Sequence, residues 1–198
     1  MKYILVLLVV FVFSGCTTVV PPVTEYRVVA KKVDFNTNSK GCEEKILKVT
    51  QAFSSSTLMS QQMNYAQGKS KQYSYSQAQW SEPPNISVSA QILKQIRKSN
   101  IFKSVLNSKS RGKGDLVLEI NIEDFMQYFN EDESKSYAVV TLDFTLVDAK
   151  SADTLASDTF SAKVDTVTLD AQGGVEALNE ALEKVTKSSL KWLDGVCR

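Results

Sequence analysis

Two stretches of this 198-residue sequence alternate apolar and polar side chains, a pattern that restricts them to strands with one buried face. In LVLEINI (116–122) and again in AVVTLDFTL (138–146), every second residue is apolar. Successive side chains of a strand point to opposite faces of the sheet, so the apolar set of each stretch shares one face. Asp124–Phe125 interrupts the first alternation, which predicts a β-bulge or a strong twist there. The second stretch is expected to send these residues inward: Ala138, Val140, Leu142, Phe144 and Leu146.

Two other segments have the 3.6-residue period of amphipathic helices. The first follows Pro83 and Pro84, which fit a first helical turn, and the second spans 173–193. Their expected buried residues are Ile86, Ala90, Leu93 and Ile96 in the first helix, and Val175, Leu178, Leu182, Val185, Trp192 and Leu193 in the second.

Shorter strands are expected at 26–33, 45–53, about 59–66, 73–80, 101–106 and 154–164. Within 45–53, Leu47, Val49 and Phe53 are expected to share one face. The order of strands and helices predicts an α+β fold, with a two-layer, mainly antiparallel sheet and two amphipathic helices packed on one face.

The N-terminus combines one basic residue, a short apolar run and a cysteine. Lys2 precedes ten apolar residues (4–13), and the small pair Ser14–Gly15 stands directly before Cys16. A ten-residue helix is about 15 Å long, about half the hydrocarbon thickness of a bilayer, so the run fits a signal peptide better than a transmembrane helix. The arrangement resembles a bacterial lipobox, in which the cysteine is diacylated and the chain is cut before it, although Phe13 replaces the usual Leu. An ordinary signal peptide with a chance cysteine is the alternative.

We therefore predict a lipoprotein signal peptide at 1–15, a lipidated tether at 16–25 and a folded domain at 26–198. Fatty acyl chains on Cys16 would anchor the protein, because each buried methylene contributes about 0.8 kcal/mol. Thr17 stands where proteobacterial sorting uses Asp to retain lipoproteins at the inner membrane. We expect a membrane lipoprotein that faces the periplasm, with the outer membrane favoured.

Charge and composition exclude several classes of function. Cleavage before Cys16 removes Lys2, so 22 basic residues (23 − 1) balance 22 acidic ones. No segment concentrates basic residues, and nucleic acid is therefore not expected as a partner. Histidine is absent, which excludes Ser–His–Asp and Cys–His catalysis and every histidine-containing zinc site. We expect a protein that is not an enzyme, with no catalytic residues, no metal and no cofactor.

Two further cysteines are predicted to form a disulfide. With Cys16 committed to lipid, Cys42 and Cys197 form an even pair in an oxidising compartment. Both are expected near the ends of elements, where the chain can adjust to bridge them. Closing a loop of about 155 residues would stabilise the fold by up to about 5 kcal/mol in the chain-entropy model. Two unpaired thiols are the alternative.

Other candidate sites have plainer explanations. Glu119, Glu123 and Asp124 cluster, as do the acidic residues of 130–133, and paired carboxylates can hydrolyse glycosides when about 5 to 9 Å apart. The first group lies on the polar face of a strand and the second in a solvated loop, so a surface role is favoured. SRGKGD (110–115) lacks the spacing of a phosphate-binding loop and is expected to be a hairpin turn. Gly173–Gly174 is expected to let the chain turn into the second helix.

A tyrosine-rich segment is the candidate binding surface. Tyr65, Tyr73 and Tyr75 offer large contact areas at low entropic cost, which suits a protein interface or a lipid-contacting surface. Packing within the fold is the alternative for these tyrosines. Trp80, at the end of the segment, is expected to lie in the core beneath the first helix.

An ordered set of segments resembles the family of ABC-type transport auxiliary lipoprotein components. These segments are YSYSQAQWSEPPN, SNIFKSV, DLVLEINIEDFMQYF, AVVTLDFTLVDA, DTFSA and GGVEALNEALEKVTKSSLKWL. The resemblance extends over about residues 26–193, and it is the order of the segments after a lipobox that is specific. The sequence has AQW where many members have ARW, which removes a charge that could belong to a partner contact.

The resemblance implies a non-enzymatic accessory protein. Members are expected to sit on a membrane leaflet that faces the periplasm and to dock onto an MCE-domain assembly, with the ABC permease and ATPase on separate chains. The expected cargo is phospholipid or a similar hydrophobic molecule. Self-association is a further expectation, because a ring-shaped partner favours a ring of subunits. The alternatives are a structural or regulatory lipoprotein that contacts cell-wall synthesis or secretion machinery, and a periplasmic hydrolase that uses carboxylates.

Overall fold

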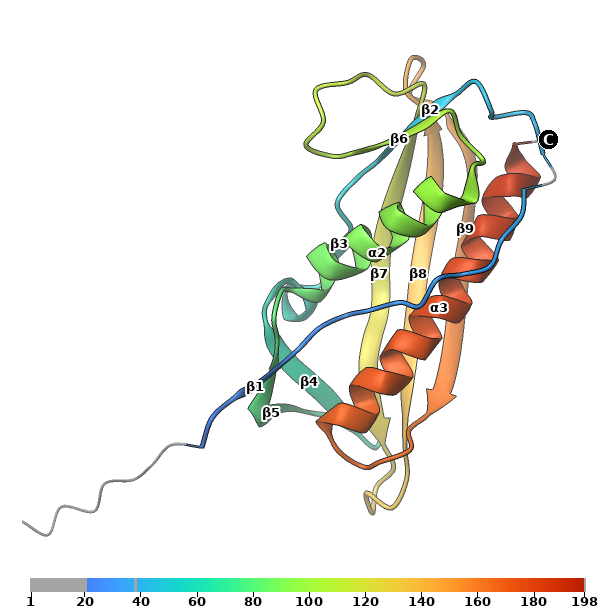
Figure 1. Ribbon diagram of the computed structural model, residues 1–198. Helices are drawn as coiled ribbons and strands as arrows, with labels where there is room; N and C mark the ends of the chain where they lie inside the picture. The colour runs from blue at the N-terminus through green and yellow to red at the C-terminus, as the bar shows by residue number, and fades with distance from the viewer. Residues whose placement is uncertain (1–20, 38, 198) are drawn as a thin grey trace, which may run out of the picture.

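The computed structural model describes residues 21–37 and 39–197, so Cys16, the predicted signal peptide and the first half of the predicted tether lie outside the described residues. The described residues form a mixed sheet of nine strands with two α-helices, and both helices lie on the same face of the sheet (Figure 1). The predicted α+β class, with a sheet and a helical layer, is therefore confirmed.

One half of the sheet is a long antiparallel meander. Strands β7 (Leu116–Phe129), β8 (Ser136–Asp148) and β9 (Thr154–Asp165) pair in that order. Every residue expected to point inward from β8 is at most 1% exposed. The ladder between β7 and β8 shifts register between Ile122 and Asp124, which confirms the predicted irregularity.

The other half consists of short strands, which are β1 (Thr24–Tyr26), β2 (Ile46–Val49), β3 (Phe53–Ser54), β4 (Gln62–Gln67), β5 (Lys71–Trp80) and β6 (Ser104–Asn107). Strands β2, β3 and β4 follow one another along β7 and run parallel to it. Strand β6 adds to β2, while β5 and then β1 extend the sheet beyond β4. The expected hairpin at 110–115 is wrong, because β6 and β7 both run parallel to β2 and the segment between them is a crossover loop.

The single strand expected at 45–53 is divided by an irregular segment. The amide of Thr50 still donates to the carbonyl oxygen of Leu118, 3.0 Å away, but the chain leaves the ladder after it. A short 3-10 helix, η1 (Ser56–Met59), then precedes β4. Leu47 and Val49 are buried as expected, whereas Phe53 is 72% exposed. The expectation for Phe53 was wrong because a break in register reverses which side chains face the core.

Helix α2 (Pro84–Ser99) begins at the predicted prolines but turns a different face to the sheet. Val88, Ile92 and Ile96 are at most 1% exposed, at a spacing of four residues. Ile86 is 41% exposed and Ala90 is exposed, so these two predicted core residues lie at the surface. The helix therefore has two apolar stripes, and the fold buries only the one that contains Val88.

Helix α3 (Ala171–Val196) runs along β8 and β9 (Figure 1) and confirms the predicted second helix. Its expected core residues are buried except for Trp192, which is half-buried between Phe144 and Phe160. The helix begins where the Asp170 carboxylate accepts a hydrogen bond from the amide of Gly173 at 2.9 Å. Trp80 is 3% exposed and packs against Phe125, so its predicted place in the core is confirmed.

The strand expected at 26–33 is mostly absent. Strand β1 ends at Tyr26, and the next eleven residues (27–37) contain no strand. Figure 1 shows this segment, called the strap below, crossing the helical layer between α2 and α3. Val28, Ala30 and Val33 are buried, while Val29 is 50% exposed. The strap bonds to side chains of the two helices instead of to neighbouring strands, which explains why a strand-like sequence is not in the sheet.

Candidate functional site

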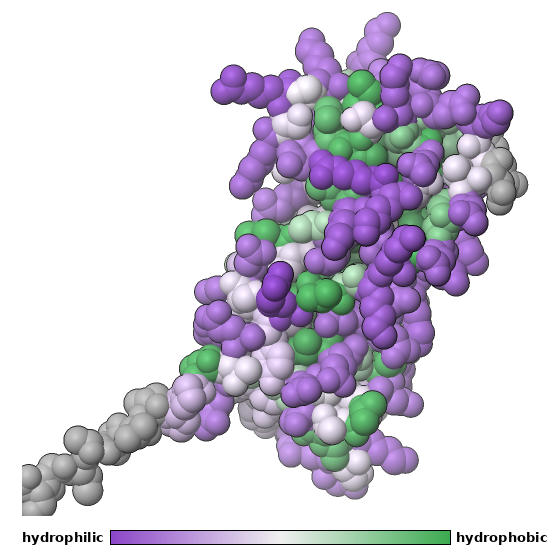
Figure 2. All heavy atoms as spheres, viewed as in Figure 1, coloured by the Kyte–Doolittle hydropathy of each residue, from purple (hydrophilic) through white to green (hydrophobic). Residues whose placement is uncertain are grey.

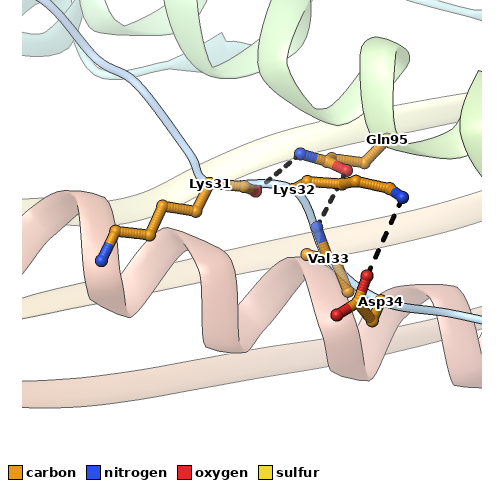
Figure 3. Close-up of polar contacts among 5 residues, drawn as sticks. All are labelled: Lys31, Lys32, Val33, Asp34 and Gln95. Carbon is orange, nitrogen blue, oxygen red and sulfur yellow. Dashed lines mark hydrogen bonds and ion pairs between the residues drawn. The ribbon is translucent and has the colours of Figure 1, made fainter.

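The strap receives from helix side chains the hydrogen bonds that a strand would receive from its neighbours. Gln95 of α2 bonds to it twice, donating from Nε2 to the carbonyl oxygen of Lys31 at 2.8 Å and accepting at Oε1 from the amide of Val33 at 3.3 Å (Figure 3). From α3, the Oδ1 atom of Asn179 accepts from the amide of Val29 at 2.9 Å. Both helices therefore fix the path of the chain that follows β1.

A disulfide follows shortly after the strap. Cys42 and Cys197 are bridged, with their Cα atoms 5.2 Å apart and both residues buried, as the sequence predicted. Nearby, the hydroxyl of Thr37 donates to the Asp194 carboxylate, and the hydroxyl of Ser39 donates to the carbonyl oxygen of Cys197. The N-terminal segment is thus joined covalently and by hydrogen bonds to the end of α3.

The structure brings the three tyrosines of the predicted binding surface together. Tyr65 of β4 stands opposite Tyr73 of β5, and their ring centroids are 5.6 Å apart. The ring of Tyr75 lies 4.6 Å from that of Tyr65, which also meets Phe129 edge-on at 5.4 Å. Tyr73 is 45% exposed, while Tyr65 and Tyr75 are half-buried. These three residues, called the tyrosine cluster below, form a continuous aromatic surface on the β4–β5 hairpin.

A buried glutamine, Gln127, bonds to the tyrosine cluster and packs closely against α3. The Tyr75 hydroxyl donates to Oε1 of Gln127 at 2.9 Å, and Nε2 of Gln127 donates to the Ser136 hydroxyl at 2.9 Å. Burial raises the pKa of the Tyr75 hydroxyl well above its ordinary value, so the group remains a donor at neutral pH. A Cβ atom on Gly174 would lie 2.0 Å from Oε1 of Gln127, so this glycine is needed for the close approach of α3.

One feature of the sequence could have identified Gln127. It is a polar residue on the face of β7 that is otherwise apolar, between Phe125 and Phe129. A polar side chain at such a position needs partners inside the protein. Gly173 and Gly174 likewise serve close packing as well as the turn into the helix, because a Cβ atom on Gly173 would lie 2.2 Å from the carbonyl oxygen of Thr168.

The carboxylates considered for hydrolysis lie on the sheet face opposite the helices or in a loop. A hydrogen bond with Asp143 raises the pKa of Glu123, and Asn121 donates to the same Glu123 carboxylate. Burial raises the pKa of Asp124, whose carboxylate accepts a hydrogen bond from the Tyr128 hydroxyl at 2.6 Å. The raised pKa of Glu123 is explained by its contact with Asp143 and that of Asp124 by burial, which the bond from Tyr128 opposes, so this cluster identifies no acid–base pair.

The acidic loop between β7 and β8 is ordered by its own side chains. The hydroxyl and the amide of Ser134 donate to the carboxylate of Asp132, which lowers the pKa of Asp132.

Within residues 21–37 and 39–197, no group of three His, Cys, Asp or Glu side chains is placed to hold a metal ion.

The surface on the helical side is mainly hydrophilic, with apolar residues showing through near β2 and β6 and at the opposite end (Figure 2). Among the described residues, no helix has both the length and the apolar character needed to cross a bilayer.

Comparison with known families identifies the chain. The model of the ABC-type transport auxiliary lipoprotein component family matches residues 33–188. The chain therefore belongs to this family, and the resemblance seen in its sequence is confirmed.

Solved structures share the fold. Protein XCC0632 from Xanthomonas campestris, of the family DUF330, superposes with a TM-score of 0.78 at 18% identity, over 87% of this chain and 95% of that one. An uncharacterized protein superposes with a TM-score of 0.67 at 11% identity, over 87% of this chain and 99% of that one. None of the curated proteins matches the sequence. At these identities the structural likeness establishes the fold alone.

Proposed function

We propose that this protein is a non-enzymatic, membrane-anchored subunit of an ABC/MCE-type transport system that moves phospholipids or other hydrophobic molecules across the periplasm. Membership of the auxiliary lipoprotein family carries this proposal, because the family match extends over most of the folded domain. The subunit acts by docking onto the MCE assembly, while the permease and the ATPase are separate chains. Lipid on Cys16 holds it at a membrane, with the outer membrane favoured.

The tyrosine cluster is the proposed contact with the MCE assembly. Tyr73 is 45% exposed, and no residue of β5 from Lys71 to Gln77 is buried by the fold. Tyrosines are enriched at interfaces, since a rigid ring buries much area and its hydroxyl finds a partner. The bond of Tyr75 to Gln127 supports this role, because a preorganised surface loses less entropy on binding.

The strap suits a protein held at one end by lipid. Residues 27–37 are fixed by both helices, and the disulfide joins the segment that follows to the end of α3. A pull on the tether would first load β1, an edge strand paired with β5, and the strap behind it would pass the load to the helical layer. Self-association of anchored subunits is compatible with this arrangement.

Purification of the full-length protein in mild detergent tests the proposed function. We expect an MCE-domain protein, with its ABC permease and ATPase, among the copurifying chains. Recovery of cell-wall synthesis or secretion proteins without any MCE protein would contradict this function and favour a structural or regulatory lipoprotein. The mass of the N-terminal peptide tests the anchor separately, because an unmodified Cys16 would contradict lipidation.

A further inference from the structure

The second apolar stripe of α2 lines a groove that the docking role does not use. Ile86, Ala90 and Leu93 form one wall, and the opposite wall comes from β2 and the end of β6. The groove has a volume of about 240 Å³, and we call it the α2 groove. Its full lining is Val49, Thr50, Gln51, Ile86, Ser89, Ala90, Leu93, Asn107, Ser108 and Lys109.

The apolar wall of the α2 groove suits a hydrocarbon chain. The fold already buries the opposite stripe of the helix, so Ile86, Ala90 and Leu93 are apolar in excess of what the core needs. Ligand pockets for whole small molecules are about 300 to 1,000 Å³, so a groove of this size fits part of one chain. Hydrophobic atoms show at the surface between α2 and β6 in Figure 2.

The mouth of the α2 groove is cationic. Lys109 is its one charged lining residue among those the structure describes, and no described carboxylate lines it. Arg97 follows Leu93 by one helical turn and is held there by a bond from Nε to the carbonyl oxygen of Val105 at 3.0 Å. An anionic group at this mouth would therefore meet the ammonium of Lys109, with Arg97 one helical turn beyond Leu93.

A second groove, beside α3, has the opposite charge. It is about 350 Å³ in volume and is lined by the carboxylates of Asp165, Glu176, Glu180 and Glu183 against a single lysine, Lys31. Like charges in such a site disfavour an anionic ligand. The two grooves thus differ in the sign of the charge at their mouths, and only the α2 groove suits an anionic amphiphile.

We propose that the α2 groove binds one acyl chain of an anionic phospholipid, with the phosphate at Lys109. The chain would cover Ile86, Ala90 and Leu93, and the phosphate would accept charge-assisted hydrogen bonds at the mouth. The protein would then hold lipid itself, in addition to docking to the transport assembly. This assignment follows from the apolar wall and the cationic mouth and does not depend on the identity of the docking partner.

Photocrosslinking tests this lipid site. The full-length lipoprotein is placed in phosphatidylcholine vesicles that contain a small fraction of phosphatidylglycerol with a diazirine in one acyl chain, and crosslinked peptides are identified by mass. We expect crosslinks within α2, at 86–93, and about tenfold fewer with the same diazirine on phosphatidylcholine, because the anionic headgroup is missing. Crosslinks confined to other peptides, or equal yields from the two lipids, would overturn the assignment.

Matched variants separate a bound chain from general membrane contact. Leu93→Trp should fill the groove and abolish the α2 crosslink, and Lys109→Glu should reduce its yield about tenfold. Lys113→Glu makes the same charge change in the same loop outside the groove lining, so the yield should stay near that of the wild type. Equal losses from the two lysine variants would contradict a site at Lys109. Copurification of the MCE protein should persist in Leu93→Trp, so failure of the lipid site and failure of the docking function can be told apart.

Discussion

Strands β8 and β5 differ in how far packing within the fold explains their side chains. Strand β8 buries a residue at every second position from Ser136 to Leu146, whereas β5 buries none between Lys71 and Gln77. The alternation in β8 is fully explained by the core between the sheet and the helices. The aromatic alternation in β5 is only partly explained by the fold, since Tyr75 has Gln127 as a partner while Tyr73 remains largely exposed. The difference separates residues that make the fold from residues that are available to a partner.

The largest effect is expected in the core beneath α3. Phe144→Ala should lower the free energy of unfolding by about 4 kcal/mol, because the side chain is fully buried between Phe160 and Trp192 and its removal leaves a cavity. Urea denaturation of the full chain in detergent measures this change. A loss below about 1 kcal/mol would contradict the place of Phe144 in a tightly packed core.

Removal of the disulfide should have the next largest effect. The double substitution Cys42→Ser/Cys197→Ser opens a bridge that spans 155 residues, and we expect a loss of about 3 kcal/mol. Reduction of the wild type before denaturation should give a loss of the same size, which serves as the control. The tyrosine cluster should keep its ring contacts, since none of its residues touches the bridge, and near-ultraviolet circular dichroism can follow them.

Gln95→Ala should release the strap. The variant loses both bonds to the strap and leaves the Val33 amide and the Lys31 carbonyl oxygen without their partner, so we expect a loss of about 2 kcal/mol. Limited proteolysis should cut within 27–37 sooner than in the wild type. The neighbouring exposed residue gives the control, because Lys94→Ala should leave both the stability and the cleavage unchanged.

Asp170→Ala should cost about 1 kcal/mol at neutral pH through loss of the helix cap. The amide of Gly173 and then the hydroxyl of Thr168 hold the pKa of Asp170 below its usual range. Because the pKa is lower in the folded state, this contribution is present above the unfolded pKa of about 3.9 and is lost as the pH falls through the folded value. The difference in stability between wild type and variant should therefore shrink below about pH 4. A difference that stays constant down to pH 2 would contradict the capping role.

The smallest effect on stability is expected at Tyr73, on the exposed strand β5. Tyr73→Ala should change the free energy of unfolding by less than about 0.5 kcal/mol, as is usual for surface positions. Leu155→Ala is the matched control, since Leu155 is 50% exposed on β9, at the other edge of the sheet. A loss of several kcal/mol from Tyr73→Ala would assign Tyr73 to the fold and remove the contrast between β5 and β8.

The sequence predicts those elements whose buried faces follow from the spacing of their apolar residues. The alternation in β7 and β8, the irregularity at Ile122–Asp124 and the apolar stripe of α3 all follow from local spacing. The path of the strap does not follow from local spacing, because its sequence is strand-like. Its partners include Gln95 and Asn179, residues more than sixty positions away. Which of two apolar stripes α2 buries is likewise decided by tertiary packing.

The candidate site was predictable to a similar extent. Aromatic alternation identified the tyrosines of β5, but their contact with Tyr65 depends on hairpin register. The role of Gln127 depends on the approach of α3 to β7, which Gly174 permits. Long-range contacts of this kind leave only weak signals in a single sequence.

Site-specific crosslinking from the β4–β5 hairpin tests the central claim, that the tyrosine cluster is the docking surface. A benzophenone amino acid is placed at position 73 or at position 155 of the full-length protein, and the crosslinked chains are identified after irradiation of cells. We expect position 73 to crosslink to an MCE-domain protein and position 155 to give at least about tenfold less of that product, because binding energy concentrates in a small part of an interface. Equal crosslinking from both positions, or none from position 73 while the MCE protein still copurifies, would contradict docking through the tyrosine cluster.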